Sequence, residues 1–330
     1  MTRTRTVKSD LRQLPTEQIL RTASNLDELS SLEIVRLMND QDATVALAVR
    51  RALAQIARAI DVVAEGLSHG GRLIYVGAGT SGPLGVLDAA ECPPTFRTDP
   101  EMVQGLIAGG DAAMFRAQEG AEDRPEDGAA AIDARSVAAA DVVMGIAAGG
   151  TTPFVHGALG RARQRGARTI LLTCVQPMVN DPEADVVIRP LVGPEVLTGS
   201  TRLKAGTATK LVLNTISTLA MVQLGKVYEN LMVDLRATNQ KLWDRGARII
   251  ATLTGLDRNR ALDLLRQADG HVKAAIVMEK RRVDLAAARD LLSRCGGRLR
   301  DALESTPGGH CPPKPTAAGA ARPTPTEKGP

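Results

Sequence analysis

Aromatic side chains are scarce in this sequence of 330 residues, where they make up only 2% of the chain. Proteins that hold single-stranded nucleic acid stack its bases on aromatic rings. So few rings argue against a nucleic-acid partner. The core must then be built from Ala, Leu, Val and Ile, and a hydrophobic fraction of 44% is enough for a sizeable one.

Long hydrophobic runs are missing as well. No stretch of about 18 apolar residues occurs, and the N-terminus, MTRTRTVKSD, lacks the apolar segment of a signal peptide. We therefore expect a soluble, cytoplasmic protein with no membrane partner.

Cysteine is rare, and charge of one sign does not dominate. The four cysteines are far apart and form no Cys-x-x-Cys pair, which disfavours a metal site or a disulfide framework. The 41 basic and 37 acidic residues are interspersed, and the net charge is +4. That mixture predicts a solvated surface, and the small positive excess suits an anionic metabolite.

The chain does contain a repeated alternation of short apolar segments and helix-like segments. Apolar residues recur every three or four positions over 45–67, which predicts one long amphipathic helix. A second long helix is predicted over 203–224. Strands that alternate with helices predict an α/β fold, a parallel sheet with helices on both faces. The predicted strands are 72–76, 141–146, 169–173 and 185–188.

The pattern changes after residue 244. Short helices are predicted over 257–268 and 284–295, each beginning with an N-cap Asp. We therefore expect a small helical C-terminal domain, followed by a Pro-rich tail that is predicted to be disordered. The predicted parts are a flexible N-terminus (1–14), the main domain (15–244), the helical domain (245–303) and the tail (304–330).

Two turns rich in Gly and hydroxyl residues follow predicted strands, 77-GAGTSG-82 and 147-AAGGTT-152. Parallel α/β sheets bind ligands at the carboxyl edge, and helix N-termini there favour anions. We predict that the two turns share one phosphate or anion pocket, although the first turn alone fits a tight turn without a ligand equally well. The predicted substrate-binding residues in them are Gly79, Thr80, Ser81, Gly150 and Thr152.

A third segment, 193-GPEVLTGSTRLKAGTATK-210, places hydroxyl and basic side chains just ahead of a helix. We predict that it forms another wall of the pocket, where Ser200 binds substrate and Lys204 or Arg202 supplies the counter-charge. The alternative is a solvated loop with a capped helix start.

Five segments in series resemble the N-acetylmuramic acid 6-phosphate etherases, which belong to the sugar isomerase (SIS) superfamily. The resemblance runs over about residues 15–300, and the glucokinase regulatory protein shares the GPEVLTGS-type signature. It implies an SIS-type parallel sheet flanked by helices, in a flavodoxin-like three-layer sandwich. It also implies a homodimer that needs no metal and no organic cofactor. The segments are GAGTSGPLGVLDAAECPPTF, GLIAGG, EGAED, GPEVLTGSTRLKAGTATK and NLMVDLRATNQKL.

The resemblance implies a carbon–oxygen lyase for a sugar-phosphate substrate. Such enzymes cleave the lactyl ether of N-acetylmuramic acid 6-phosphate to N-acetylglucosamine 6-phosphate and D-lactate, in peptidoglycan recycling. The elimination needs one base and one acid. Matched to the family's motifs, Glu122 is the base and Glu91 is the acid. Without the resemblance, Glu122 also fits an acidic surface turn, and Glu91 also fits a carboxylate at a helix end.

The chain departs from the family pattern around the predicted pocket. Pro83 stands where relatives usually carry Arg, and Gly149-Gly150-Thr151 stands where Ser-Gly-Arg is usual. These departures keep two alternatives open, a non-catalytic protein that senses a sugar phosphate and a divergent SIS sugar-phosphate isomerase. A DNA-binding regulator is the weakest interpretation, because the N-terminal segment is too short for a helix-turn-helix domain.

Overall fold

The structure is a computed structural model that describes residues 14–305. Predictions for the flexible N-terminus, apart from its last residue, and for the Pro-rich tail beyond residue 305 lie outside the described residues. By its internal contacts the chain divides into two units, Met1–Leu224 and Gly225–Pro330. The division therefore comes earlier than the change of sequence pattern after residue 244.

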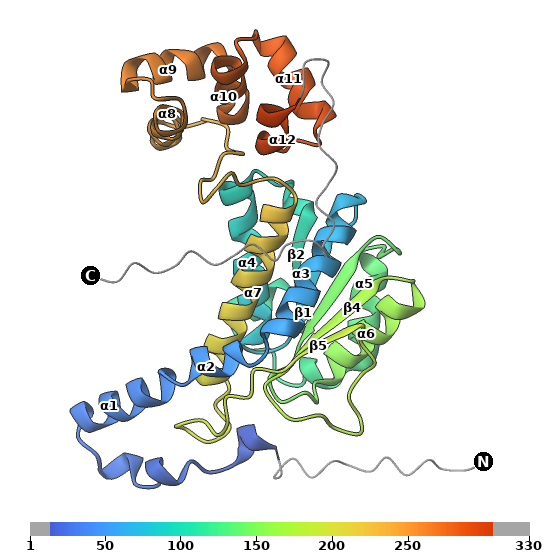
Figure 1. Ribbon diagram of the computed structural model, residues 1–330. Coiled ribbons are helices and arrows are strands. Elements are labelled where there is room, and N and C mark those ends of the chain that lie inside the picture. The colour runs from blue at the N-terminus through green and yellow to red at the C-terminus, as the bar shows by residue number, and fades with distance from the viewer. Residues whose placement is uncertain (1–13, 306–330) are drawn as a thin grey trace. The chain divides into compact units, whose positions relative to one another are not determined.

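The first unit is built on a five-stranded parallel sheet with the strand order β2-β1-β3-β4-β5 (Figure 1). The predicted α/β class is confirmed, and all four predicted strands are present. The strands are β1 (Leu73–Gly77), β2 (Val103–Ile107), β3 (Val142–Ile146), β4 (Arg168–Leu172) and β5 (Val186–Ile188).

Strand β2 is the strand that the sequence pattern does not predict. Its sequence, VQGLI, contains a polar residue and a glycine, which weaken a strand pattern. Gly105 is required here by close packing, since a Cβ atom at this position would lie 2.5 Å from Cγ2 of Val86. Gly105 weakens the strand pattern in the sequence, and in the fold it allows the helix that contains Val86 to pack closely on the strand.

Helices cover both faces of the sheet (Figure 1). Helices α3 and α4 pack on one face, and α5 and α6 on the other, so the sheet is the middle layer of a sandwich. Helix α7 packs against α3 and α4. The helices are α1 (Ser31–Asp42), α2 (Val45–Arg50), α3 (Leu53–Ser68), α4 (Ser81–Phe96), α5 (Pro125–Ala134), α6 (Pro153–Gln164) and α7 (Lys204–Gln223).

The prediction of one continuous helix over 45–67 is wrong, because α2 and α3 are separate. The break lies at Ala52, whose φ of −103° and ψ of 11° are not helical. The bend allows both helices to pack against α7. Apolar spacing of three and four residues continues through the break, so periodicity alone does not reveal it.

The second unit is a group of short helices around a core of its own. The N-cap side chains of Asp257 and Asp284 accept backbone hydrogen bonds as predicted. No helix within residues 14–305 is long and apolar enough to cross a membrane. The helices of this unit are α8 (Gln240–Thr254), α9 (Arg258–Gln267), α10 (Val272–Arg281), α11 (Leu285–Arg294) and α12 (Leu299–Glu304).

A buried polar network joins β1, α4 and α7. Asp88 of α4 is 5% exposed and accepts hydrogen bonds from the Tyr75 hydroxyl at 2.8 Å, Asn214 Nδ2 at 2.7 Å and Ser217 Oγ at 3.2 Å. Burial, together with the neighbouring Asp88 carboxylate, raises the pKa of Tyr75 well above its usual value. The phenol therefore stays a hydrogen-bond donor, and α4 is fixed to the sheet and to α7.

We expect Asp88→Ala to lower the free energy of unfolding by about 3 kcal/mol, because it leaves buried donors on two neighbouring elements without an acceptor. Urea denaturation measures the change. The matched control is Asp61→Ala, which removes an exposed carboxylate that accepts one hydrogen bond from Gln223 Nε2. A loss below about 1 kcal/mol for Asp88→Ala would contradict a structural role for the network.

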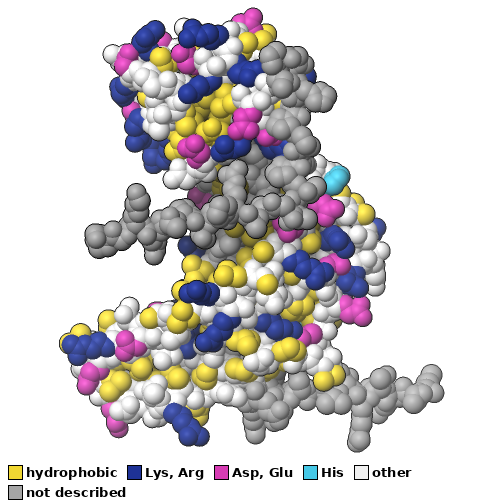
Figure 2. All heavy atoms as spheres, viewed as in Figure 1, with side chains coloured by type: hydrophobic (Ala, Val, Ile, Leu, Met, Phe, Trp, Pro, Cys, Tyr) yellow, Lys and Arg dark blue, Asp and Glu magenta, His cyan; other side chains and the backbone are white. Residues whose placement is uncertain are grey.

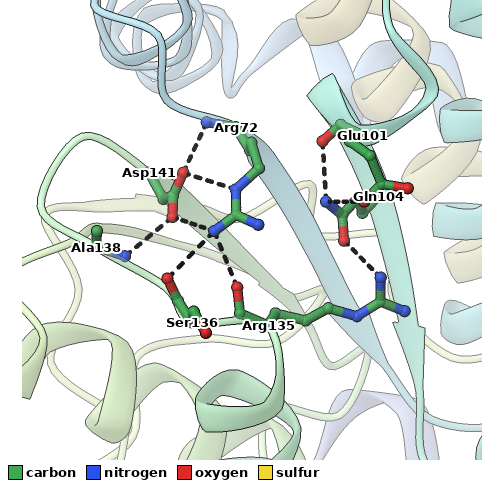
Figure 3. Close-up of polar contacts among 7 residues, drawn as sticks. All are labelled: Arg72, Glu101, Gln104, Arg135, Ser136, Ala138 and Asp141. Atoms are coloured by element: carbon green, nitrogen blue, oxygen red, sulfur yellow. Dashed lines mark hydrogen bonds and ion pairs between the residues drawn. The ribbon is translucent and has the colours of Figure 1, made fainter.

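A second carboxylate network lies at the amino ends of β1 and β3 (Figure 3). Asp141 accepts hydrogen bonds from the Arg72 backbone N–H at 2.8 Å, from Arg72 Nη2 at 2.7 Å and from the Ala138 N–H at 2.9 Å. Burial acts to raise the pKa of Asp141, but these hydrogen bonds outweigh it, and the pKa lies below its usual 3.8. Asp141 thus stabilises the fold as a carboxylate.

The lowered pKa of Asp141 predicts a pH dependence. The stabilisation is present above the unfolded-state pKa and is lost as the pH falls through the lower folded-state pKa. We expect Asp141→Asn to cost about 3 kcal/mol at neutral pH, and the difference from the wild type to shrink below about pH 4. Urea midpoints at both pH values test this. Asp263→Asn, which removes an exposed pair with Arg266, serves as the control.

Candidate functional site

The two Gly-rich turns lie side by side because β1 and β3 are neighbours in the sheet. The first turn connects β1 to α4, and the second connects β3 to α6. Between β1 and β3 the strand order reverses direction, with β2 on one side and β4 on the other. Ligands of open α/β sheets bind at this position, so the fold brings the two predicted turns to one place.

The first turn offers two hydroxyl groups, and two of its backbone N–H groups are already bound within the turn. The Ser81 N–H donates to the Ala78 carbonyl and the Gly82 N–H to the Gly79 carbonyl, both at 3.2 Å. Thr80 is the N-cap of α4, but its side chain makes no capping hydrogen bond. Within residues 14–305 the Thr80 and Ser81 hydroxyls have no hydrogen-bond partner. Both are therefore free to bind a ligand.

The second turn is held from two sides. Gly150 has a φ of +74°, and its carbonyl accepts a hydrogen bond from His156 Nε2 of α6 at 2.7 Å. The Ala148 carbonyl accepts from the Cys174 N–H at 2.9 Å. These contacts fix the backbone of the turn and leave Thr152, the N-cap of α6, without a side-chain capping bond.

The third predicted segment is anchored by a carboxylate that the sequence pattern does not single out. Glu195 is fully buried and accepts hydrogen bonds from the backbone N–H groups of Lys204 and Ala205, both at 2.9 Å. It therefore closes the N-terminus of α7. A Cβ atom at Gly206 would lie 3.6 Å from Cγ2 of Thr80, so the start of α7 adjoins the first turn.

The predicted counter-charge, Lys204, already has a hydrogen-bond partner within the same chain. Its ammonium donates to Gln41 Oε1 at 2.8 Å. Burial lowers the pKa of Lys204, and the charges of Glu195 and Asp42 act against that shift. Ser200, also predicted to bind substrate, is half-buried ahead of α7 and donates its backbone N–H to the Leu197 carbonyl.

A cavity of about 550 Å³ lies at the carboxyl edge of the sheet and is lined by both turns. Four of the predicted site residues line it: Gly79, Thr80, Thr152 and the expected base, Glu122. Ser81, Gly150, Ser200 and Lys204 do not line it. Hydroxyl groups thus lie in one cavity with a carboxylate, which suits a phosphorylated substrate that undergoes proton transfer.

Glu91 is not part of this cavity. It is exposed on the third turn of α4, eight positions after the cavity-lining Pro83. Eight residues of α-helix correspond to a rise of about 12 Å. Of the two carboxylates that the family resemblance pairs, Glu122 thus lines the cavity and Glu91 of the same chain does not.

Arg116 is a cavity residue that the sequence analysis does not identify. It lies between the 3₁₀ helices Asp111–Met114 and Ala121–Asp123, in the segment that follows β2. Because β2 is not predicted, the loop after it has no predicted position at the sheet edge. Arg116 is the only Lys or Arg that lines the cavity within the described part of the chain.

Possible metal ligands do not gather in the described part of the chain, and two of its cysteines are buried thiols. Residues 14–305 contain no group of three or more His, Cys, Asp or Glu residues that could hold a metal ion. Cys92 and Cys174 are buried free thiols. Burial, followed by neighbouring carboxylates, raises the pKa of each to about 12, so neither is a nucleophile at neutral pH.

Comparisons with known proteins identify the family. The chain is 55% identical over 292 residues to the N-acetylmuramic acid 6-phosphate etherase of Crocosphaera subtropica, with 88% of this chain and 96% of that protein covered. The etherase of Gloeobacter violaceus is 57% identical over 296 residues, with 89% and 96% covered. The chain belongs to the N-acetylmuramic acid 6-phosphate etherase family.

Domain models and solved structures give further similarities. Residues 55–163 match the glucokinase regulatory protein N-terminal SIS domain, and residues 229–275 match the C-terminal lid domain of that protein. The solved phosphoheptose isomerase of Neisseria gonorrhoeae is 17% identical with a TM-score of 0.46, and the match covers 58% of this chain and 99% of that one.

Proposed function

We propose that this protein is a lyase that cleaves the D-lactyl ether of N-acetylmuramic acid 6-phosphate. The products are N-acetylglucosamine 6-phosphate and D-lactate, and the role is recycling of cell-wall sugar. The observation that carries this proposal is identity of 54–57% with N-acetylmuramic acid 6-phosphate etherases over most of the chain. The cavity supports it, because Glu122 and two hydroxyl-bearing turns meet there.

Different side chains take the roles of phosphate ligand, base and acid in the proposed reaction. The cavity-lining hydroxyls of Thr80 and Thr152 hold the phosphate, and the sugar opens to expose an aldehyde at C1 that acidifies the C2 proton. The Glu122 carboxylate removes that proton as the C3–oxygen bond breaks, and Glu91 donates a proton to the departing lactate oxygen. Water then adds its oxygen to C3 and a proton returns to C2, so the net change is hydrolysis of the ether.

We further propose that the protein is a cytoplasmic homodimer. Helix α1 supports a dimer, because none of its residues is buried, and Leu32 and Val35 are 57% and 62% exposed. Figure 1 shows α1 at the lower left, away from the layers of the sheet, and Figure 2 shows hydrophobic side chains on its visible face. Contact with a second copy would remove such a face from water.

A non-catalytic sugar-phosphate sensor is the second candidate function. Pro83, which stands where relatives usually carry Arg, lines the cavity itself. Gly149 lies in the second turn and lacks the usual hydroxyl. Fewer ligands for an anion favour weaker binding or a changed substrate, whereas the presence of Glu122 in the cavity favours catalysis.

Release of D-lactate from N-acetylmuramic acid 6-phosphate by the purified wild-type protein tests the proposed function. We expect Glu122→Gln and Glu91→Gln each to lower kcat by about 100-fold or more, the usual contribution of a general base or acid. Asp123→Asn is the matched control, since this exposed carboxylate neighbours Glu122 but does not line the cavity. Sugar-phosphate binding without lactate release would establish the sensor instead.

Gly149→Ser tests whether the missing hydroxyl weakens binding. A Cβ atom at Gly149 would meet no atom closer than 3.9 Å, so the variant should fold normally. We expect KM to fall about tenfold, which is the lower end of the range for one hydrogen bond to a charged group.

Gly150→Ser is the control for Gly149→Ser. Gly150 has a φ of +74°, and a Cβ atom there would lie 2.5 Å from Cε of Met178, so this variant should lose stability instead. An unchanged KM in a stable Gly149→Ser protein would show that the residue 149 side chain does not reach the substrate.

A further inference from the structure

The cavity at the carboxyl edge of the sheet has two chemically different walls. The two Gly-rich turns form one wall, which presents the hydroxyls of Thr80 and Thr152. The segment that follows β2 forms the other wall. Of the described residues that line the cavity, every charged one belongs to this second wall, namely Arg116, Glu119 and Glu122. Hydroxyl donors and charged groups thus face a bound substrate from different sides.

The guanidinium of Arg116 is available to a ligand. Its backbone is fixed, because its N–H donates to the Ala112 carbonyl and its carbonyl accepts from Gln118 Nε2, both at 3.2 Å. Within residues 14–305 its side chain has no hydrogen-bond or ion-pair partner, although Glu119 and Glu122 line the same cavity. The positive charge is therefore not paired inside the protein.

The expected base and this guanidinium belong to one loop that folds back onto the sheet. Gly109 follows the end of β2, and a Cβ atom there would lie 2.7 Å from Cβ of Gln118 and 3.4 Å from Cβ of Ala121. The chain between Arg116 and Glu122 thus packs against the end of the strand instead of extending into solvent. A substrate whose C2 faces Glu122 therefore faces the wall that also carries Arg116.

The proposed substrate carries two anionic groups at different distances from C2. The phosphate is on C6, whereas the lactyl ether is on C3, next to the carbon that loses its proton. With the phosphate at the hydroxyl wall, the lactyl carboxylate comes to the charged wall, where Glu119 and Glu122 repel it unless a cation is present. Among the described residues Arg116 is the only Lys or Arg in that wall.

On the basis of the proposed function, we infer that Arg116 binds the carboxylate of the lactyl group and so selects N-acetylmuramic acid 6-phosphate over sugar phosphates that lack this group. A guanidinium can bind a carboxylate through two parallel N–H···O bonds, which fix the orientation of the leaving group as well as its position. The carboxylate is two bonds from the ether oxygen, so the same contact holds the bond that breaks near Glu122. Arg116 is thus a specificity-determining residue, and the phosphate stays with the hydroxyls of the turns.

A neutral analogue of the substrate tests this assignment. In the carboxamide of N-acetylmuramic acid 6-phosphate the lactyl group is uncharged, whereas the phosphate and the ether are unchanged. From release of N-acetylglucosamine 6-phosphate, we expect the wild type to cleave the amide with a kcat/KM at least about tenfold below that for the acid, the lower end of the range for one charge-assisted hydrogen bond. Arg116→Gln should lose a similar factor on the acid and cleave both compounds equally well. A variant that keeps the wild-type preference for the acid would overturn the inference.

Inhibition by a product distinguishes the carboxylate from the phosphate as the partner of Arg116. N-acetylglucosamine 6-phosphate keeps the phosphate but has no lactyl group, and it competes with the substrate for the cavity. We expect Arg116→Gln to leave its inhibition constant within about twofold of the wild-type value, the usual limit for independent contacts. A rise of about tenfold would assign Arg116 to the phosphate instead and overturn the inference.

Arg124→Gln is the matched control. This exposed guanidinium follows Glu122 by two positions, pairs with Asp127 at 3.7 Å and does not line the cavity. We expect its kinetics with both compounds to equal those of the wild type. Arg116→Lys should recover part of the preference for the acid, because it keeps the charge but loses the two-bond geometry. A loss in Arg124→Gln as large as that in Arg116→Gln would show a general effect of charge and overturn the inference.

Failure of the proposed function is a separate outcome. A wild type that cleaves neither compound would overturn the lyase, and calorimetry then tests Arg116 without catalysis. We expect the wild type to bind N-acetylmuramic acid 6-phosphate at least about tenfold more tightly than N-acetylglucosamine 6-phosphate, and Arg116→Gln to bind the two equally. Equal binding of both sugars by the wild type would overturn the inference.

Discussion

The site depends on the hydrogen bonds that the buried carboxylate of Asp88 accepts. It lies in the middle of α4 and binds donors from β1 and α7, so it sets the position of the whole helix. The first Gly-rich turn begins that helix, and Glu91 lies on its third turn. A buried carboxylate with neutral donors costs free energy unless its hydrogen bonds are met. The geometry of α4 is therefore strongly specified, and the hydroxyls of its first turn are held in place.

The sequence predicts the regular part of the fold well, because strands buried on both faces read as short apolar runs. It misses β2, since Gly105 serves close packing rather than strand propensity. It also misses the break at Ala52, which the apolar period crosses unchanged. The Gly-rich turns could be placed from the sequence because a turn after a parallel strand must lie at the carboxyl edge.

The remaining site residues required three-dimensional information. Glu195 closes a helix nine residues away, a spacing that belongs to no capping motif. Arg116 follows the strand that the sequence does not predict. Lys204 looks like a ligand for phosphate in the sequence, but its ammonium binds Gln41, which lies 163 residues earlier in the chain. Contacts of such sequence separation depend on the packing of α1 and α7, which no local pattern encodes.

The structure shows what surrounds Pro83 and Gly149, two of the residues at which the chain departs from the family pattern. Pro83 removes a guanidinium from the cavity wall, yet Arg116 supplies one to the same cavity. A proline at this position also suits the first turn of a helix, where its missing N–H has no partner to lose. A Cβ atom at Gly149 would make only ordinary van der Waals contacts, at 3.9 Å or more, so the loss of a hydroxyl there does not follow from packing. By the family pattern the chain lacks guanidinium groups at residues 83 and 151 and a hydroxyl at residue 149, whereas Thr151 adds a hydroxyl and Arg116 supplies positive charge to the cavity. Such an exchange of anion ligands points to altered substrate affinity rather than to a lost reaction.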